Sequence, residues 1–388
     1  MLTVDAEKAN YPQEDESLIS EVPKNIHVHT TKTSDPYVIY SLFGRKAPSS
    51  GFANESVQGV SGYVKKLARF IRGNVFIPDP RKGWNKFAIK KAGELIKTHG
   101  IETIITTSPP HSTQLIGLDL KKKHGVKWVA DMRDPWTKIY YVSELLQTKW
   151  AQNKNANLER TVLENADSVI TVSQSLASEF CELAPRLKPE SIEVISNGFD
   201  EDDFQLDVPL DKQFTVGYMG TITQQYDITG LLKAVASIED DVAFRFIGDA
   251  PTQIRNQIDE VSTITEFTGY LNHNKAIEKV ASSSVLLLVI PKIESNKGIL
   301  TGKMFEYLAL KRPILGIGPV DGDAAAILKE TGAGKMFNYA DEIGIRQFLE
   351  EQLKHFQETS ASLQTYNVES YSRRGLTKKL DAVLRGQD

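Results

Sequence analysis

Short apolar runs alternate with helical patterns along almost the whole chain, and this alternation restricts the fold more than any other feature of the sequence. Five runs lie in the first half and five in the second: NIHVHT (25–30), TIITTS (103–108), WVADM (128–132), SVITVS (168–173), IEVIS (192–196), FTVGYM (214–219), VAFRFIG (242–248), ITEFTG (264–269), SVLLLVI (284–290) and PILGIG (313–318). Apolar strands separated by helices form parallel sheets that are covered on both faces. The sequence therefore predicts an α/β protein.

Helix ends support this interpretation. The patterns at 85–99 and 110–124 both finish in His-Gly, at His99-Gly100 and His124-Gly125. Glycine is the residue that most readily adopts the left-handed conformation found just after a helix. We therefore expect both helices to end at these dipeptides.

The length predicts two domains, because 388 residues exceed what one hydrophobic core usually supports. The break lies in the acidic, aperiodic segment NGFDEDDFQLDVPLDKQ (197–213). We expect two doubly wound, Rossmann-like domains that face each other. Their predicted bounds are 1–198 for the first, 199–212 for the linker, 213–365 for the second and 366–388 for a C-terminal amphipathic helix.

The composition is that of an ordinary soluble globular protein, with 40% hydrophobic and 25% charged residues. Cys181 is the only cysteine, so no internal disulfide can form. The longest apolar run, VLLLVI (285–290), is too short to span a membrane, and the N-terminus lacks the pattern of a secretory signal. We expect a cytoplasmic protein.

Basic residues are concentrated in one part of the first half. Residues 60–127 contain 14 Lys and Arg against 4 Asp and Glu, although the whole chain has a net charge of −4. The segment 62–84 interleaves Lys65, Lys66, Arg69 and Arg72 with apolar residues. This pattern suits a lipid headgroup layer or a phosphate-bearing acceptor, and it also suits a solvated helix face. No nucleic-acid-binding signature is present.

In open α/β sheets, ligands bind outside the carboxyl ends of the strands, so the residues after each strand are the candidates for a site. Such segments crowd one edge of both predicted sheets, which favours a ligand in the cleft between the domains. In the second half the candidates are glycines and polar residues that follow successive strands: Gly220, Thr221, Gly248, Tyr270, Asn296 and Gly298.

The sequence TGK at 301–303 predicts a helix start that binds phosphate. A helix that begins at Thr301 and Gly302 would attract an anion through the free N–H groups and the positive dipole end of its first turn. Lys303 would add a positive charge beside them. Glu306 lies one turn further along, among apolar neighbours that leave it little solvent-facing surface. A carboxylate there can accept hydrogen bonds from the two hydroxyls of a ribose. The simpler interpretation is that Glu306 only stabilises the first turn.

In the first half, DMRDPW (131–136) is the most specific segment. Arg133 lies between Asp131 and Asp134, so these side chains could brace the loop as an ion pair. Alternatively, Arg133 or Asp134 orients an acceptor hydroxyl or a phosphate. His111 follows two prolines at a predicted helix start, where it could hydrogen bond the acceptor or a leaving phosphate, or serve as a local cap.

Six segments together resemble the retaining glycosyltransferases of family 4, which have the GT-B fold. They are SPPHSTQLIGLDLKKKHGVKWVADMRDPWT, ADSVITVSQSL, ISNGFD, GYMGTI, FIGDAP and GKMFEYLALKRPIL. The resemblance implies that the first domain binds the acceptor, the second binds the nucleotide-sugar, and the last helix crosses back to the first domain. It also implies that Glu306 binds the ribose and that Arg133 and Asp134 face the reacting sugar.

Three features depart from the family pattern. Gly298 stands where such families often have a glutamate that contacts the donor sugar. The segment after Gly220 lacks the usual Arg and Lys, so Lys303 and backbone donors would carry more of the phosphate charge. The segment MLTVDAEKANYP resembles the family's second strand, so the first strand would be missing from the first sheet.

The resulting hypothesis is a metal-independent, retaining glycosyltransferase without a cofactor. It would use a nucleoside-diphosphate sugar and a lipid-linked or polysaccharide acceptor, in cell-surface polysaccharide biosynthesis, on the inner face of the plasma membrane. No cluster of His, Cys or carboxylates has metal-ligand spacing. The alternatives are a sugar-nucleotide epimerase of related architecture and a non-catalytic scaffold. A nicotinamide-dependent enzyme is disfavoured, because no Gly-x-Gly-x-x-Gly follows a strand.

Overall fold

The computed structural model describes residues 1–9, 22–34, 62–205, 208–294, 296–359 and 366–386. The chain divides into two compact units. Unit 1 comprises Met1–Val172 and Leu176–Val194, and unit 2 comprises Ser173–Ser175 and Ile195–Gly386.

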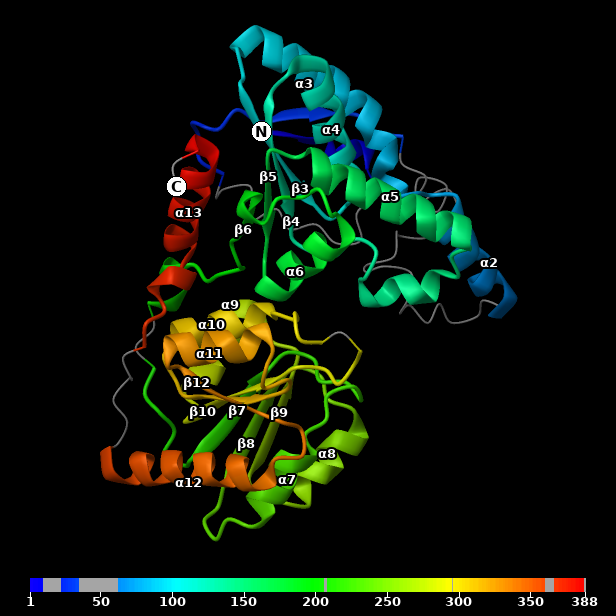
Figure 1. Ribbon diagram of the computed structural model, residues 1–388. Helices are drawn as coiled ribbons and strands as arrows, with labels where there is room; N and C mark the ends of the chain where they lie inside the picture. Colours follow the sequence, from blue (N-terminus) through cyan, green and yellow to red (C-terminus); the bar gives the residue numbers. More distant parts are fainter. Residues whose placement is uncertain (10–21, 35–61, 206–207, 295, 360–365, 387–388) are drawn as a thin grey trace. The chain divides into compact units, whose positions relative to one another are not determined.

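Unit 1 contains a four-stranded parallel sheet in the order β3-β4-β5-β6, and a separate parallel pair formed by β1 and β2 (Figure 1). Its strands are β1 (Leu2–Val4), β2 (His29–Thr31), β3 (Thr103–Ser108), β4 (Lys127–Met132), β5 (Ser168–Thr171) and β6 (Ile192–Val194). Its helices are α2 (Gly62–Asn74), α3 (Asn85–His99), α4 (Ser112–His124), α5 (Lys149–Asn165) and α6 (Gln174–Leu183). Short 3-10 helices are η1 (Ala6–Lys8), η3 (Pro80–Trp84), η4 (Tyr140–Leu145) and η5 (Pro189–Ser191).

The helix ends predicted for unit 1 are confirmed. Helices α3 and α4 end at His99 and His124, and the glycines that follow them have φ values of 60° and 69°. Glycine tolerates this left-handed conformation because it has no Cβ. The core beneath these helices is built around Trp128, which is fully buried and whose indole N–H donates to Thr106 Oγ1 at 2.7 Å.

Unit 2 contains a six-stranded parallel sheet in the order β12-β11-β10-β7-β8-β9 (Figure 1). Its strands are β7 (Thr215–Met219), β8 (Ala243–Ile247), β9 (Thr265–Gly269), β10 (Val285–Val289), β11 (Ile314–Ile317) and β12 (Gly334–Phe337). Its helices are α7 (Thr229–Ala236), α8 (Thr252–Asp259), α9 (His273–Ala281), α10 (Gly302–Leu310), α11 (Asp323–Thr331), α12 (Glu342–Thr359) and α13 (Arg373–Arg385), with η6 (Glu201–Phe204) and η7 (Glu369–Tyr371) as 3-10 helices.

Helices cover both faces of the unit 2 sheet, which explains why its central strands are apolar throughout. Along β10, Leu287 and Val289 pack into a core with residues of α7, α8 and α12, whereas Leu286 and Leu288 pack into a second core with residues of α9, α10 and α11 (Figure 1). Successive side chains of a strand point to opposite faces, so both sets are buried. The α/β prediction with parallel sheets is confirmed, and each of the ten predicted runs overlaps an observed strand.

Strand β12 was not among the predicted strands. It contains four residues, GKMF, of which only Met336 and Phe337 are buried. A pattern of two apolar residues after a Gly and a Lys is too short to be recognised as a strand by period alone. Its place in the sheet comes from pairing with β11, where Ile314 lies opposite Gly334.

The acidic segment predicted as a linker is attached to unit 2. Phe199 is buried, its N–H donates to Tyr371 O at 3.2 Å, and its carbonyl accepts from Arg373 N at 2.8 Å. The carboxylate of Asp200 pairs with Arg373 at 3.0 Å. The division between the units therefore falls before Ile195, slightly earlier than the predicted bound, and the observed C-terminal helix α13 belongs to unit 2. Its predicted return to the first domain stays a prediction.

Candidate nucleotide-sugar site

Two glycines directly follow β7 and β8 at the carboxyl edge of the unit 2 sheet. Gly220 and Gly248 have φ values of 115° and 126°, which residues with a Cβ rarely adopt. Gly220 N donates to Ile247 O at 2.8 Å, and a Cβ on Gly248 would lie 2.5 Å from Gly220 O. The two loops therefore approach each other through backbone alone, with no side chain between Gly220 and Gly248.

Lys303 points into this edge from the first turn of α10. Its Nζ donates to Tyr218 Oη at 2.7 Å and lies 4.2 Å from the centre of that ring. A Cβ on Gly220 would come within 3.0 Å of the same Nζ, so the glycine makes space for the cation. Burial lowers the pKa of Lys303 to about 8, although the nearby Glu306 acts in the opposite direction. Among the residues that the structure describes, no carboxylate forms an ion pair with Lys303.

Tyr218 and Tyr307 hold this arrangement in place. Tyr218 Oη donates to Thr221 O at 3.1 Å while it accepts from Lys303, so it ties the loop after β7 to α10. Tyr307 is fully buried, and its Oη accepts from Met219 N at 2.8 Å. Burial raises the pKa of both phenols, so both stay neutral. The sequence reasoning missed these two residues; the available signal was that a tyrosine in an apolar core needs a partner for its hydroxyl.

The start of α10 offers backbone donors, as the TGK pattern predicted. Thr301 is the N-cap residue and Gly302 the first helical residue. The Thr301 hydroxyl makes no capping bond, and its buried Oγ1 has no hydrogen-bond partner in the described part of the chain. Gly302 is exposed, with no atom within 4 Å of the position its Cβ would occupy. An anion could thus reach the first N–H groups of the helix beside Gly302.

Glu306 is hydrogen bonded to a histidine that the sequence reasoning did not select. His273 Nε2 lies 2.8 Å from Glu306 Oε1, and both side chains remain partly accessible. His273 is the first residue of α9, whose start is fixed by the Asn272 side chain accepting from Lys275 N. The histidine is separated from Glu306 by 33 residues, so no local pattern connects them. The Glu306 side chain is 24% exposed, in line with the small solvent-facing surface expected from its apolar neighbours.

The remaining candidate residues of unit 2 differ in whether they are exposed and free to contact a ligand. Tyr270 is 83% exposed just after β9, so its ring is free to stack on a ligand. Asn296 is tied to its own loop instead, since its Nδ2 donates to Pro291 O and to Tyr339 Oη, both at 2.9 Å. Gly298 lies half-buried two residues further along.

In unit 1 the bracing ion pair of the DMRDPW loop is present. Arg133 Nη1 lies 3.5 Å from Asp131 Oδ1, and Thr107 Oγ1 donates to Asp131 Oδ2 at 2.8 Å. Asp134 makes neither contact, and burial raises its pKa while Arg133 opposes that shift. In this loop Asp131 is paired with Arg133, whereas the carboxylate of Asp134 could orient a ligand.

His111 lies apart from that ion pair, in a small pocket of unit 1. Its ring is 7% exposed and stacks on Trp136, with ring centres 5.2 Å apart and planes inclined by 8°. Neither ring nitrogen has a hydrogen-bond partner among the described residues. His111 occupies the N-cap position of α4, as the alternative of a local cap expected, but its side chain makes no capping bond.

The basic segment forms helix α2, and its exposed surface is more apolar than basic. Tyr63, Leu67 and Phe70 are 85%, 58% and 44% exposed. Lys66 is exposed beside them, whereas Arg69 pairs with Glu144 at 3.7 Å and Arg72 lines the pocket of His111. The side chain of Lys65 lies outside what the structure describes. No helix in the described ranges is long and apolar enough to cross a membrane.

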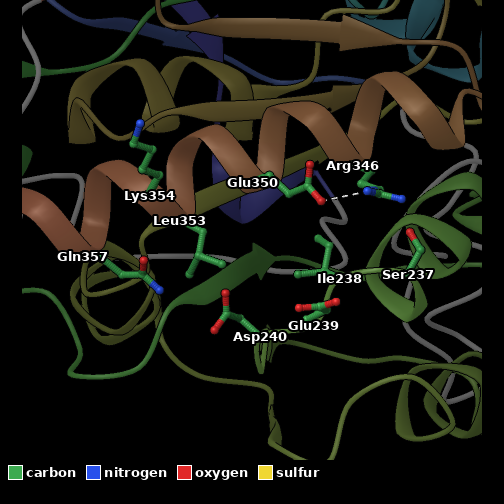
Figure 2. Close-up of a pocket in the computed structure, with 9 residues that line it drawn as sticks. All are labelled: Ser237, Ile238, Glu239, Asp240, Arg346, Glu350, Leu353, Lys354 and Gln357. Carbon is green, nitrogen blue, oxygen red and sulfur yellow. Dashed lines mark hydrogen bonds and ion pairs between the residues drawn. The ribbon is translucent and has the colours of Figure 1, made fainter.

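A pocket of unit 2 lies away from this edge. Figure 2 shows it between the end of α7 and the side of α12, lined by Glu239, Asp240, Arg346, Lys354 and their neighbours. Glu239 and Asp240 shortly precede β8, so the pocket lies at the amino end of that strand. Arg346 Nε already pairs with Glu350 at 2.8 Å. Ligands of parallel α/β sheets bind at the other end, so this pocket is not the candidate site.

Comparison with known proteins gives a family model that matches part of the chain, and solved structures that share its fold. Residues 42–203 match the model of Glycosyltransferase Family 4. The structure of HepE from Anabaena in complex with UDP is 13% identical, with a TM-score of 0.58 and coverage of 99% of both chains. The complex of HepE with UDP-glucose is 14% identical, with a TM-score of 0.56 and the same coverage. The apo form of the lipopolysaccharide outer core galactosyltransferase WaaB is 11% identical, with a TM-score of 0.57 over 100% of this chain and 99% of that chain.

The search of curated proteins gives no match. At these identities the solved structures establish the fold, and the sequence match concerns the first half of the chain. The chain has the GT-B fold of glycosyltransferases, and its residues 42–203 match the model of Glycosyltransferase Family 4.

Proposed function

We propose that the protein is a retaining glycosyltransferase whose donor is a nucleoside-diphosphate sugar bound at the carboxyl edge of the unit 2 sheet. The family match supports the transferase class. The observation that carries the site is Lys303, a mostly buried cation whose hydrogen-bond partner is the neutral Tyr218 hydroxyl. A buried charge without a counter-ion is costly, so the arrangement favours an anionic ligand beside it.

The pyrophosphate would lie between Gly220, Lys303 and the start of α10. Backbone N–H groups at the start of α10 would donate to its oxygens, and Lys303 would neutralise part of its charge. In the transfer step the same groups would stabilise the charge that develops on the leaving nucleoside diphosphate. Because Lys303 and the backbone N–H groups already lie at the leaving group, we propose that the reaction needs no metal.

Glu306 would bind the ribose one turn deeper along α10. Its Oε1 is held by His273 at 2.8 Å, which leaves Oε2 to accept from a ribose hydroxyl. The exposed ring of Tyr270 would stack on the base. Since HepE, a protein of the same fold, has been crystallised with UDP and with UDP-glucose, we propose a uridine nucleotide as the first donor to test.

The nucleotide prediction is checked by thermal unfolding with UDP, GDP, ADP and CDP, each with and without EDTA. A ligand present at 100 times its Kd stabilises the folded state by about 2.7 kcal/mol. For a unit of this size, that free energy corresponds to roughly 5–10 °C in Tm. We expect such a rise with one diphosphate, unchanged by EDTA. No rise with any of the four would reject the donor site and favour a non-catalytic scaffold.

The acceptor is proposed to be lipid-linked or a polysaccharide, in the synthesis of cell-surface polysaccharide. The exposed apolar residues of α2, together with Lys66, suit peripheral binding to the cytoplasmic face of a membrane. An epimerase would instead release a sugar isomer of the donor nucleotide in the absence of any acceptor. Product analysis by chromatography separates these two activities.

The membrane prediction concerns sedimentation with vesicles that contain anionic phospholipid. Replacing Leu67 and Phe70 with Ser and Lys66 with Gln should lower the bound fraction several-fold, because both apolar burial and charge attraction are lost. The matched control replaces Lys90 and Lys97, which lie on α3 of the same unit. Equal sedimentation of the α2 variant and the wild type would show that this helix face is merely solvated.

A further inference from the structure

A histidine at the start of α9 lies at the same edge of the unit 2 sheet as the candidate donor site. Gly269 ends β9 with a φ of 68° and forms an isolated bridge with Gly248, which in turn lies against Gly220. The loop that follows leads to His273, whose side chain is 56% exposed although its Nε2 lies 2.8 Å from Glu306 Oε1. A ligand bound at this edge can therefore contact the His273 ring.

The contact with Glu306 determines which nitrogen of the His273 ring carries the proton. A carboxylate only accepts hydrogen bonds, and a neutral imidazole has one N–H group and one nitrogen with a free lone pair. Nε2 must therefore hold the proton, which it donates to Glu306 Oε1. Nδ1 is then an acceptor, and within the described ranges no group donates to it.

Three side chains follow one another in the order of the parts of a nucleotide. Lys303 lies beside Gly220, Glu306 is one helical turn further along α10 and acts electrostatically on Lys303, and His273 is hydrogen bonded to Glu306. One turn of helix advances by about 5 Å, which is close to the separation of neighbouring parts of a nucleotide. With the diphosphate at Lys303 and the ribose at Glu306, the base would lie at His273.

An acceptor nitrogen beside the base distinguishes between the bases. Uracil and guanine carry a hydrogen on the ring nitrogen of their pairing edge, whereas cytosine and adenine carry a lone pair there. A lone pair that faces Nδ1 repels it and leaves both nitrogens without a donor, and such a mismatch lowers affinity strongly. Tyr270, which is 83% exposed, would stack on the face of the base and leave this edge free for His273.

We propose that His273 determines the specificity of the donor site for the base, through a hydrogen bond that Nδ1 accepts from the ring N–H of uracil or guanine. The proposal rests on the proposed function, because that function places the diphosphate at Lys303 and the ribose at Glu306. His273 then has two roles, since it donates to the carboxylate that binds the ribose and accepts from the base. Donors that contain cytosine or adenine are disfavoured.

The test is calorimetric titration near pH 8, where histidine is ordinarily neutral, with UDP, CDP and 3-methyluridine diphosphate, or with GDP, ADP and 1-methylguanosine diphosphate if GDP binds best. The wild type should bind UDP or GDP at least tenfold more tightly than its N-methyl analogue. In His273→Ala this preference should fall to less than threefold. His273→Gln should keep most of it, because its amide can donate to Glu306 and its carbonyl can accept from the base. His99→Ala, at an exposed histidine of unit 1, is the matched control and should behave as the wild type.

The outcomes separate this proposal from the donor site itself. Wild-type protein that binds none of UDP, GDP, ADP and CDP would reject the donor site, and the role of His273 with it. Tightest binding of CDP or ADP, or equal affinity for the best diphosphate and its N-methyl analogue, would overturn the role of His273 and leave the phosphate site of Lys303 intact. The role would also be refuted if His273→Ala kept the full preference of the wild type, or if His273→Gln lost it as completely as His273→Ala.

Discussion

Replacing Lys303 with Met should weaken the binding of a nucleoside diphosphate by about 10–100-fold. A hydrogen bond to a charged group contributes about 1.5–3 kcal/mol, and Lys303 is the cation beside Gly220 and the start of α10. Methionine keeps the length and most of the packing of the side chain, so the loss would reflect the charge. Isothermal titration calorimetry with the diphosphate found in the nucleotide panel measures it.

The matched control is Lys329→Met, because Lys329 is an exposed lysine on α11 of the same unit. The nucleoside without phosphates provides a second comparison, since its affinity should be the same in Lys303→Met and in the wild type. Equal diphosphate affinity in Lys303→Met and Lys329→Met would remove Lys303 from the phosphate site.

The same lysine should make the stability of the ligand-free protein depend on pH. Its pKa is about 8 in the folded protein, below the ordinary value of 10.5, because burial disfavours the charged form. Between these two values the unfolded chain binds a proton that the folded protein has released, so stability rises with pH. Relative to Lys303→Met, the free energy of unfolding of the wild type should increase by on the order of 2 kcal/mol from pH 8 to pH 10.5. Denaturant titrations of both proteins at several pH values measure this difference, and a constant difference would contradict the burial of the charge.

Replacing Glu306 with Ala should weaken nucleotide binding by about 1–3 kcal/mol, because the carboxylate would lose its charge-assisted bonds to the ribose. The sharpest readout compares UDP with its 2′,3′-dideoxy analogue. Glu306→Ala should bind the two with similar affinity, whereas the wild type should prefer UDP by roughly 10–100-fold. Loss of the His273 contact should change folding stability little, since that pair is partly exposed.

Glu278→Ala is the matched control for the ribose prediction. Glu278 is an exposed acid on α9, the helix that carries His273. The control should keep the preference for UDP over the dideoxy analogue. A preference that survives in Glu306→Ala would refute the ribose assignment while leaving the phosphate site of Lys303 untouched.

The sequence alone was enough for the fold class, because the relevant signals are local. Apolar runs with short periods predicted strands that overlap β2 to β11, and His-Gly dipeptides predicted where α3 and α4 end. The start of α10 at Thr301-Gly302 followed from the same kind of pattern. Since parallel strands end at one edge of a sheet, the sequence also indicated where ligands would bind in unit 2.

The sequence could not establish which side chains meet at that edge. Lys303 bonds to Tyr218 across 85 positions and Glu306 bonds to His273 across 33, so both contacts depend on how β7, α9 and α10 pack. Whether His111 was a cap or a ligand-binding residue was equally open, because the stacking on Trp136 and the capping of α4 by Asp79 join separate segments.

The sequence by itself therefore determined the alternating strands and helices, the parallel sheets and the edge at which they end, because backbone periodicity and helix capping act over a few residues. Only the tertiary structure decided that His273 holds Glu306 and that, among the described residues, Lys303 has no paired carboxylate and the buried His111 has no hydrogen-bond partner. These properties arise from burial and from contacts between distant segments, and burial sets the cost of each unpaired polar group.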